Sequence, residues 1–363
     1  DDFVSGEELT ATEFNKVKNY WIVDGELPEG PEILDGDVVF VLGDEVGTPE
    51  AEITAITGSG ITHTYGDFVA FEFLTSGTMT CTEGLLNEAL LIGGGGSGGK
   101  SIGGGGGSGG YVSTTSAFLS AATHTVTVGA GGATNTGAAI INGLSSSVGL
   151  LIALGGGGGG ASGGIGGSGG SGGGGEGSGY APQGNDAGVG RAGGTGVGRN
   201  GGGGSATEVG YSGTVSGNGG AGLSSSITGA VVVRAAGGGS GGFNVTAGVG
   251  GSSIGGDGTT NNTEGSAATV NTGSGGGGGG YPGTGSGGNG GEGGSGVVIV
   301  KVKASNASNV DKSGWTEVTA LMLAEAKKKR ELERKAQQAA RVLEAKNEEL
   351  SGATQMDIEG DLI

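Results

Sequence analysis

Apolar and polar side chains alternate over residues 61–82 of the chain. Val69, Phe71 and Phe73 fall on every second position, and polar or small residues lie between them. In a β-strand, residues two apart share one face of the sheet. Gly77 interrupts the pattern before a second strand-like stretch. The segment therefore predicts a β-hairpin with one buried face.

Short apolar runs occur elsewhere along the chain, and most contain β-branched residues, which favour strands. Three of them predict buried strands, over residues 37–42, 89–92 and 297–302. Weaker strand-like islands cover residues 123–128, 148–154 and 230–234.

Glycine separates these islands and changes what the fold can be. Of the 97 glycines in the 363 residues, 83 lie in residues 93–296, so this block cannot build an ordinary apolar core. Three states are open to such a sequence. Disorder is the default, since glycine loses the most backbone entropy on folding. Collagen is excluded, because it needs glycine at every third position and abundant proline, and only five prolines are present. The third state is a bundle of polyglycine-II helices, whose backbone groups hydrogen-bond to neighbouring segments.

Charge is as unevenly placed as glycine. Residues 1–90 hold 19 acidic and two basic side chains, whereas the whole chain has a net charge of −19. No segment offers a basic face for phosphates, so nucleic acid is excluded as a main partner. We interpret residues 1–60 as an acidic attachment or adaptor module, in which Thr10 or Thr12 caps a short helix that carries Phe14 and Trp21.

The order of these elements resembles a known family. The strand-like residues 61–78, the sequence Ala-Leu-Leu-Ile-Gly-Gly-Gly-Gly at 89–96, residues 120–132 and the closing Gly-Val-Val-Ile-Val-Lys at 296–301 carry the resemblance. Together, over residues 61–303, they resemble the glycine-rich domain common in tail-fibre and adhesin proteins of bacteriophages, cyanophages included. The resemblance implies polyglycine-II rods framed by β-strands, usually in a homotrimeric fibre.

A second, independent resemblance lies at the start of the chain. Residues 5–15, Ser-Gly-Glu-Glu-Leu-Thr-Ala-Thr-Glu-Phe-Asn, are similar to the opening of many phage tail and baseplate proteins. The resemblance implies other virion tail or baseplate proteins as partners. No leader or membrane-spanning run is recognised, so we expect synthesis in the host cytoplasm, no membrane insertion and a final location in the virion tail or fibre.

The last part of the chain departs from the family pattern. Residues 304–314 are expected to be a linker and residues 351–363 a tail, and the glycine-free residues 315–350 predict an α-helix. Spacings of four and three residues give it a weak heptad seam that would serve a coiled coil or a partner protein, and a solvated charged helix is the alternative. The seam consists of Leu332, Ala336, Ala339, Leu343, Lys346 and Leu350.

Residues 94–101 match the phosphate-binding loop G-x-x-x-x-G-K-S, ending in Lys100 and Ser101. That chemistry needs a helix directly after the serine, but five glycines follow Ile102, so we interpret the match as spurious. Asp257, with the asparagines and glutamate after it, does not reproduce a calcium loop. With only two histidines and one cysteine in the chain, we expect no metal, no cofactor and no catalytic site.

Recognition is the remaining role, and it must come from side chains that interrupt the glycine runs. Aromatic residues beside Asn, Asp and Arg suit sugars or outer-membrane receptors, although the same residues would also serve as plain connections between rods. The candidates are Tyr180, Asn185, Asp186, Arg191, Tyr211, Asn261, Asn262 and Tyr281.

We therefore expect a mainly β fold with a glycine-rich polyglycine-II helix bundle framed by β-strands and a C-terminal α-helix. The expected function is non-enzymatic: a bacteriophage virion structural protein, either a tail fibre or an adhesin component in host attachment. The alternatives are an architectural virion component (adaptor, neck or head fibre) without its own receptor and, disfavoured, an exported bacterial glycine-rich matrix protein.

Overall fold

A computed structural model describes residues 20–24, 38–42, 49–115, 117–162, 164–175, 183, 198–199, 201–212, 217–319 and 328. The chain divides into two compact units, Asp1–Pro49 and Glu50–Ile363. In the first unit, β1 (Tyr20–Asp24) and β2 (Val38–Leu42) form a parallel pair. The apolar run over residues 37–42 predicted β2. The helix expected to include Trp21 is wrong at that position, because the sequence Tyr-Trp-Ile-Val consists of strand-favouring residues. Residues 1–19 lie outside the described part.

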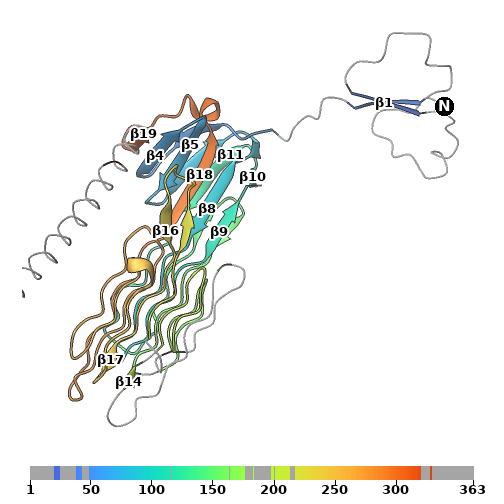
Figure 1. The fold of residues 1–363 in the computed structure, drawn as a ribbon. Coiled ribbons are helices and arrows are strands. Elements are labelled where there is room, and N and C mark those ends of the chain that lie inside the picture. The colour runs from blue at the N-terminus through green and yellow to red at the C-terminus, as the bar shows by residue number, and fades with distance from the viewer. Residues whose placement is uncertain are drawn as a thin grey trace, which may run out of the picture. The chain divides into compact units, whose positions relative to one another are not determined.

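The second unit contains two β-sheets (Figure 1). The six-stranded sheet has the order β19 (Thr316–Thr319), β4 (Gly60–Tyr65), β5 (Phe68–Phe73), β18 (Val297–Lys303), β8 (Glu88–Ile92) and β9 (Tyr111–Thr114). The five-stranded sheet has the order β13 (Leu151–Ala153), β12 (Ser146–Val148), β11 (Ala122–Thr127), β6 (Gly77–Cys81) and β3 (Ile53–Ile56).

Three short ladders and two 3-10 helices add to the two sheets. The ladders pair β7 (Gly84–Leu85) with β10 (Phe118–Leu119), β14 (Gly198–Arg199) with β17 (Gly242–Phe243), and β15 (Leu223–Ser225) with β16 (Val232–Arg234). The 3-10 helices are η1 (Gly251–Ser253) and η2 (Ala304–Ala307).

Strand β18 shows how the sequence builds two apolar layers. Val298 and Val300 face the core between the two sheets, which also contains Phe71 of β5 and Met79 of β6. Ile299 points the other way, into a second cluster that the β15–β16 hairpin covers. Both faces of β18 are buried, which explains why its sequence is a continuous apolar run rather than an alternating one.

The glycine block continues from the strands as extended segments that run side by side (Figure 1). Successive backbone N–H groups of one segment donate to three different neighbours, and each neighbour recurs every third residue. Over residues 93–101, the bonds join Gly93, Gly96 and Gly99 to Gly110, Gly107 and Gly104; Gly94 and Ser97 to Leu144 and Ile141; and Gly95, Gly98 and Ser101 to Gly294, Gly291 and Gly288. We call this region the glycine lattice.

The lattice depends on glycine because its backbones approach more closely than a side chain permits. A Cβ atom placed on Gly105 would lie 1.9 Å from the carbonyl oxygen of Gly238, and one placed on Gly98 would lie 1.9 Å from that of Gly277. Buried backbone groups must be hydrogen-bonded, and here the neighbouring segments satisfy them without an apolar core.

The fold class predicted from the sequence is wrong in its helical parts. Within the described ranges, the only helices of more than one residue are η1 and η2, of three and four residues, and Lys328 is a single residue in helical conformation. The glycine segments are extended chains rather than a helix bundle. Without Cβ atoms, neighbouring backbones come close enough for N–H groups to bond sideways.

The predicted α-helix over residues 315–350 is also wrong where it begins. Residues Thr316–Thr319 form β19, which pairs in parallel with β4. Three of these four residues are β-branched, and Trp315 just before them packs its ring edge against Phe73, with centroids 4.8 Å apart. Apart from Lys328, the later positions of that helix lie outside the described residues, and so do the seam residues Leu332, Ala336, Ala339, Leu343 and Leu350.

Candidate functional site

The glycine segments turn at the end of the lattice that also holds β14 and β17 (Figure 1). Residues 100–102 form one such turn, between the antiparallel segments 93–99 and 103–110. Ser101 and Ile102 have φ angles of +55° and +54°, and Ser162 in another turn has +51°. This left-handed region costs a side-chain-bearing residue roughly 1 kcal/mol, whereas glycine enters it freely.

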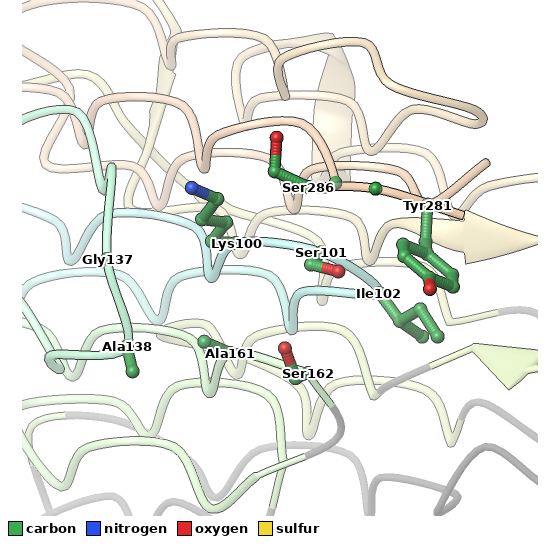
Figure 2. A pocket seen from close by; sticks show the side chains of 11 residues that line it. Lys100, Ser101, Ile102, Gly137, Ala138, Ala161, Ser162, Tyr281 and Ser286 are labelled. Atoms are coloured by element: carbon green, nitrogen blue, oxygen red, sulfur yellow. The ribbon is translucent and has the colours of Figure 1, made fainter. Parts of the chain in front are cut away.

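Four turns surround a pocket of about 520 Å³ (Figure 2). Among the described residues, its polar side chains are one lysine, one tyrosine and three serines, with no carboxylate or histidine. The lining residues are Lys100, Ser101, Ile102, Gly137, Ala138, Ala161, Ser162, Tyr281, Gly285, Ser286 and Gly287. We call this the turn pocket. Its volume lies within the range of roughly 300–1,000 Å³ that is usual for small-ligand sites.

Lys100 supplies the charge of the turn pocket. Its Nζ donates a hydrogen bond to the carbonyl oxygen of Thr136 at 3.0 Å, and it forms no ion pair with any described residue. An ammonium group has three donors, so two remain for other partners. Residues 103–110, which a phosphate-binding loop would need as a helix, are an extended segment of the lattice.

Tyr281 supplies the aromatic wall of the turn pocket. Its ring lies against that of Phe243, with centroids 5.3 Å apart and planes inclined by 60°, and its N–H donates to the carbonyl oxygen of Gly242. The aromatic contact and the backbone bond hold the ring in place. Of the predicted receptor-contact residues that the structure describes, Tyr281 is the one that lines this pocket.

The other receptor candidates lie elsewhere. Asn261 and Asn262 are exposed in the turn of residues 259–263, beside a second hollow of about 390 Å³ whose lining includes Asp257 but no lysine or arginine. Tyr211 is 48% exposed and lines neither hollow. Tyr180, Asn185, Asp186 and Arg191 lie outside the described residues.

A buried charged cluster lies between the six-stranded sheet and the β15–β16 hairpin. Glu72 accepts one hydrogen bond from Arg234, at 2.6 Å, and shares another with Nε2 of His63, at 2.7 Å. Burial alone would raise the pKa of Glu72, but the His63 hydrogen bond and the Arg234 charge outweigh it and lower that pKa. Nδ1 of His63 and Nη1 of Arg234 have no hydrogen-bond partner among the described residues.

This cluster is shielded from solvent, which decides its role. The side chains of His63, Glu72 and Arg234 are only 9%, 8% and 4% exposed. A substrate has no access to such a group, so the cluster fastens the hairpin to the sheet. Sequence reasoning did not identify it, because Glu72 and Arg234 are 162 residues apart.

Sequence reasoning also did not identify Ser162, Ser286 and Ile102 as members of one site. Their only signal is that each breaks a glycine run, and many other residues share that property. Lys100 and Ser101 have a different signal in the sequence, their match to the phosphate-binding loop pattern.

The described part of the chain contains neither a metal-binding cluster nor a membrane-spanning helix. No group of three or more His, Cys, Asp or Glu side chains is placed to hold a metal ion there. Within the same residues, no helix combines the length and the apolar character needed to cross a bilayer.

Two β-sheets that extend into a hydrogen-bonded lattice of glycine segments define a glycine-rich β-module. The family model of the glycine-rich domain matches residues 74–303, more than half of the chain, so the chain belongs to the glycine-rich domain family. No curated protein matched the chain.

Proposed function

We propose that the chain is a structural protein of a bacteriophage virion, a tail-fibre or adhesin component that contributes to host attachment. The observation that carries the proposal is that scaffold and exposed turns are separate parts of the second unit. A lattice held by backbone hydrogen bonds presents side chains at its turns, and four of these turns enclose one pocket. Binding residues commonly lie on loops that a rigid scaffold positions.

The role we propose is binding rather than catalysis. The polar groups of the turn pocket are an ammonium, a phenol and three hydroxyls. General acid–base catalysis most often uses histidine, aspartate or glutamate, and none of these occurs in the described lining of the pocket. A lysine beside an aromatic ring and hydroxyls is instead suited to orienting a polar ligand.

Family resemblance supports the virion setting and the proposed partners. The glycine-rich domain of this kind is common in phage fibre proteins, and the start of the chain is similar to those of tail and baseplate proteins. We accordingly propose a homotrimer that associates with other tail proteins and carries its receptor contacts on the glycine turns.

The test uses virions of the phage whose genome encodes this chain. Gold-labelled antibody against the purified protein should decorate the tail or its fibres in electron micrographs. The purified protein should also reduce adsorption of the phage to its host, and its mass in solution should be that of a trimer. Tail labelling without adsorption blocking would favour the architectural alternative, and absence of label from virions would refute the proposal.

A further inference from the structure

The turn pocket has a composition that selects among ligands. Its described lining holds one positive charge and no negative one, although the chain as a whole carries a net charge of −19. A lysine without an acidic partner inside a hollow favours an anionic ligand. The second hollow, with Asp257 and no cation in its lining, provides an internal contrast.

The hydroxyls of the turn pocket are free to bind. Within the described part of the chain, the side-chain oxygens of Ser101, Ser162 and Ser286 form no hydrogen bond. Each hydroxyl offers one donor and two acceptor positions, which matches the hydroxyls of a sugar. Tyr281, held against Phe243, adds a ring on which the C–H face of a sugar can pack.

Two serines occupy backbone positions that glycine would fill more easily. Ser101 and Ser162 both take left-handed φ angles in a chain with 97 glycines. Strained backbone at residues that converge on one pocket is a feature of ligand sites. The cost of the strain is offset if the two hydroxyls are used for binding.

The backbone of the pocket argues against a phosphate. A phosphate site usually draws on several free N–H groups or on a helix N-terminus. Here the N–H of Ser101 is bonded to Gly288, and that of Ser162 is bonded to Lys100 and Ser101. One ammonium group matches a monoanion such as a carboxylate better than a doubly charged phosphate.

We infer that the turn pocket binds a carboxylated sugar, with Lys100 on the carboxylate, Tyr281 against the ring and the three serines on its hydroxyls. This inference rests on the proposed host-attachment function and names the class of ligand. A site with a single charge pair and one aromatic wall should bind one sugar unit weakly, and a trimer would present three copies of it.

The experiment is a titration of the full chain with D-glucuronate in which saturation-transfer NMR measures binding. D-Glucose tests the sugar without the charge, acetate tests the charge without the ring, and glucose 6-phosphate tests the phosphate. We expect saturable binding of D-glucuronate at least tenfold tighter than that of the other three. Equal binding of D-glucose, tighter binding of glucose 6-phosphate, or no saturation by D-glucuronate would each overturn the inference.

Variants locate the site. Lys100→Gln retains a donor for Thr136 but removes the charge, and it should weaken D-glucuronate binding at least tenfold. Lys312→Gln, a lysine away from the pocket, is the matched control and should leave binding unchanged. Unaltered affinity in Lys100→Gln would overturn the inference. Should that variant not fold, raising the salt concentration on the unmodified protein must weaken D-glucuronate binding, and salt-independent binding would refute the role of Lys100.

The outcome separates this inference from the proposed function. Tail labelling and adsorption blocking without D-glucuronate binding would leave the fibre proposal in place and remove only the ligand class. Binding of D-glucuronate by a protein that is absent from virions would do the reverse.

Discussion

Arg234 in β16 donates a hydrogen bond from Nη2 to Oε1 of Glu72 in β5, at 2.6 Å and in a buried position. His63 contacts the other carboxylate oxygen. One glutamate thus joins the hairpin to the sheet through two partners, and the pair supports the face of the sheet from which the second apolar cluster is built.

Replacing the glutamate should destabilise the second unit. Glu72→Gln leaves the buried Arg234 charge without its counter-ion, and breaking a buried ion pair on one side typically costs about 3–5 kcal/mol. Thermal unfolding followed by circular dichroism would measure the loss. Glu83→Gln is the matched control, because Glu83 is exposed. Equal melting temperatures for the two variants would contradict the fastening role of Glu72.

Acid should weaken the same contact. Glu72 has a folded-state pKa below its ordinary value of 4.5, so the stability it contributes is present above pH 4.5 and is lost as the pH falls through the folded-state pKa. The stability difference between the unmodified protein and Glu72→Gln should therefore shrink as the pH falls below 4.5. Melting curves collected from pH 7 to pH 3 would measure it, and a difference independent of pH would count against the assignment.

A single methyl group should disturb the glycine lattice. In Gly105→Ala, the new Cβ would lie 1.9 Å from the carbonyl oxygen of Gly238, so the two segments must separate. Overpacking of this kind typically costs about 1–3 kcal/mol. Gly137→Ala is the control, since its nearest neighbour would be 4.0 Å away. A lattice that melts at the same temperature in both variants would show that its packing is looser than the structure indicates.

The ring of Trp315 should stabilise the edge of the six-stranded sheet. It contacts Phe73 and Phe71 edge-on, with centroids 4.8 and 6.1 Å apart, immediately before β19. Trp315→Ala should lower stability by at least about 1 kcal/mol, as loss of aromatic contacts does. It should also speed amide hydrogen exchange in Thr316–Thr319, whereas Phe118→Ala, at a side chain 51% exposed, should affect neither. Unchanged exchange in β19 would mean that the tryptophan does not secure it.

The strands were predictable because their signal is local. The apolar runs behind β2, β8 and β18 appear in the sequence at the positions where the structure has strands. Alternation also predicted strands at β5 and β6, but the hairpin predicted between them is wrong, because β5 pairs with β4 and β18, and β6 belongs to the other sheet. Pairing depends on contacts between distant parts of the chain, which a local pattern does not contain.

The candidate site was less predictable for a related reason. Lys100, Ser162 and Tyr281 meet only because the glycine segments that carry them turn at the same distance along the lattice. The length of each segment decides where its turn lies. Glycine runs of similar composition do not reveal which residues of neighbouring segments pair. The predicted C-terminal helix is wrong at its start because composition is a local signal. The helix-favouring composition predicts a helix from Trp315 onward, but the contact of Trp315 with Phe73 and the pairing of β19 with β4 favour a strand there.

The three-residue repeat of the glycine lattice constrains how such a chain can change length in evolution. Two antiparallel segments joined by a turn can each gain three residues, and every hydrogen bond between segments then re-forms with the same neighbours. Adding one or two residues instead points the N–H donors toward the wrong neighbours. Related chains should therefore differ in lattice length by multiples of three residues per segment. The turns, which lie outside the repeat, are free to vary in sequence and to exchange one binding surface for another.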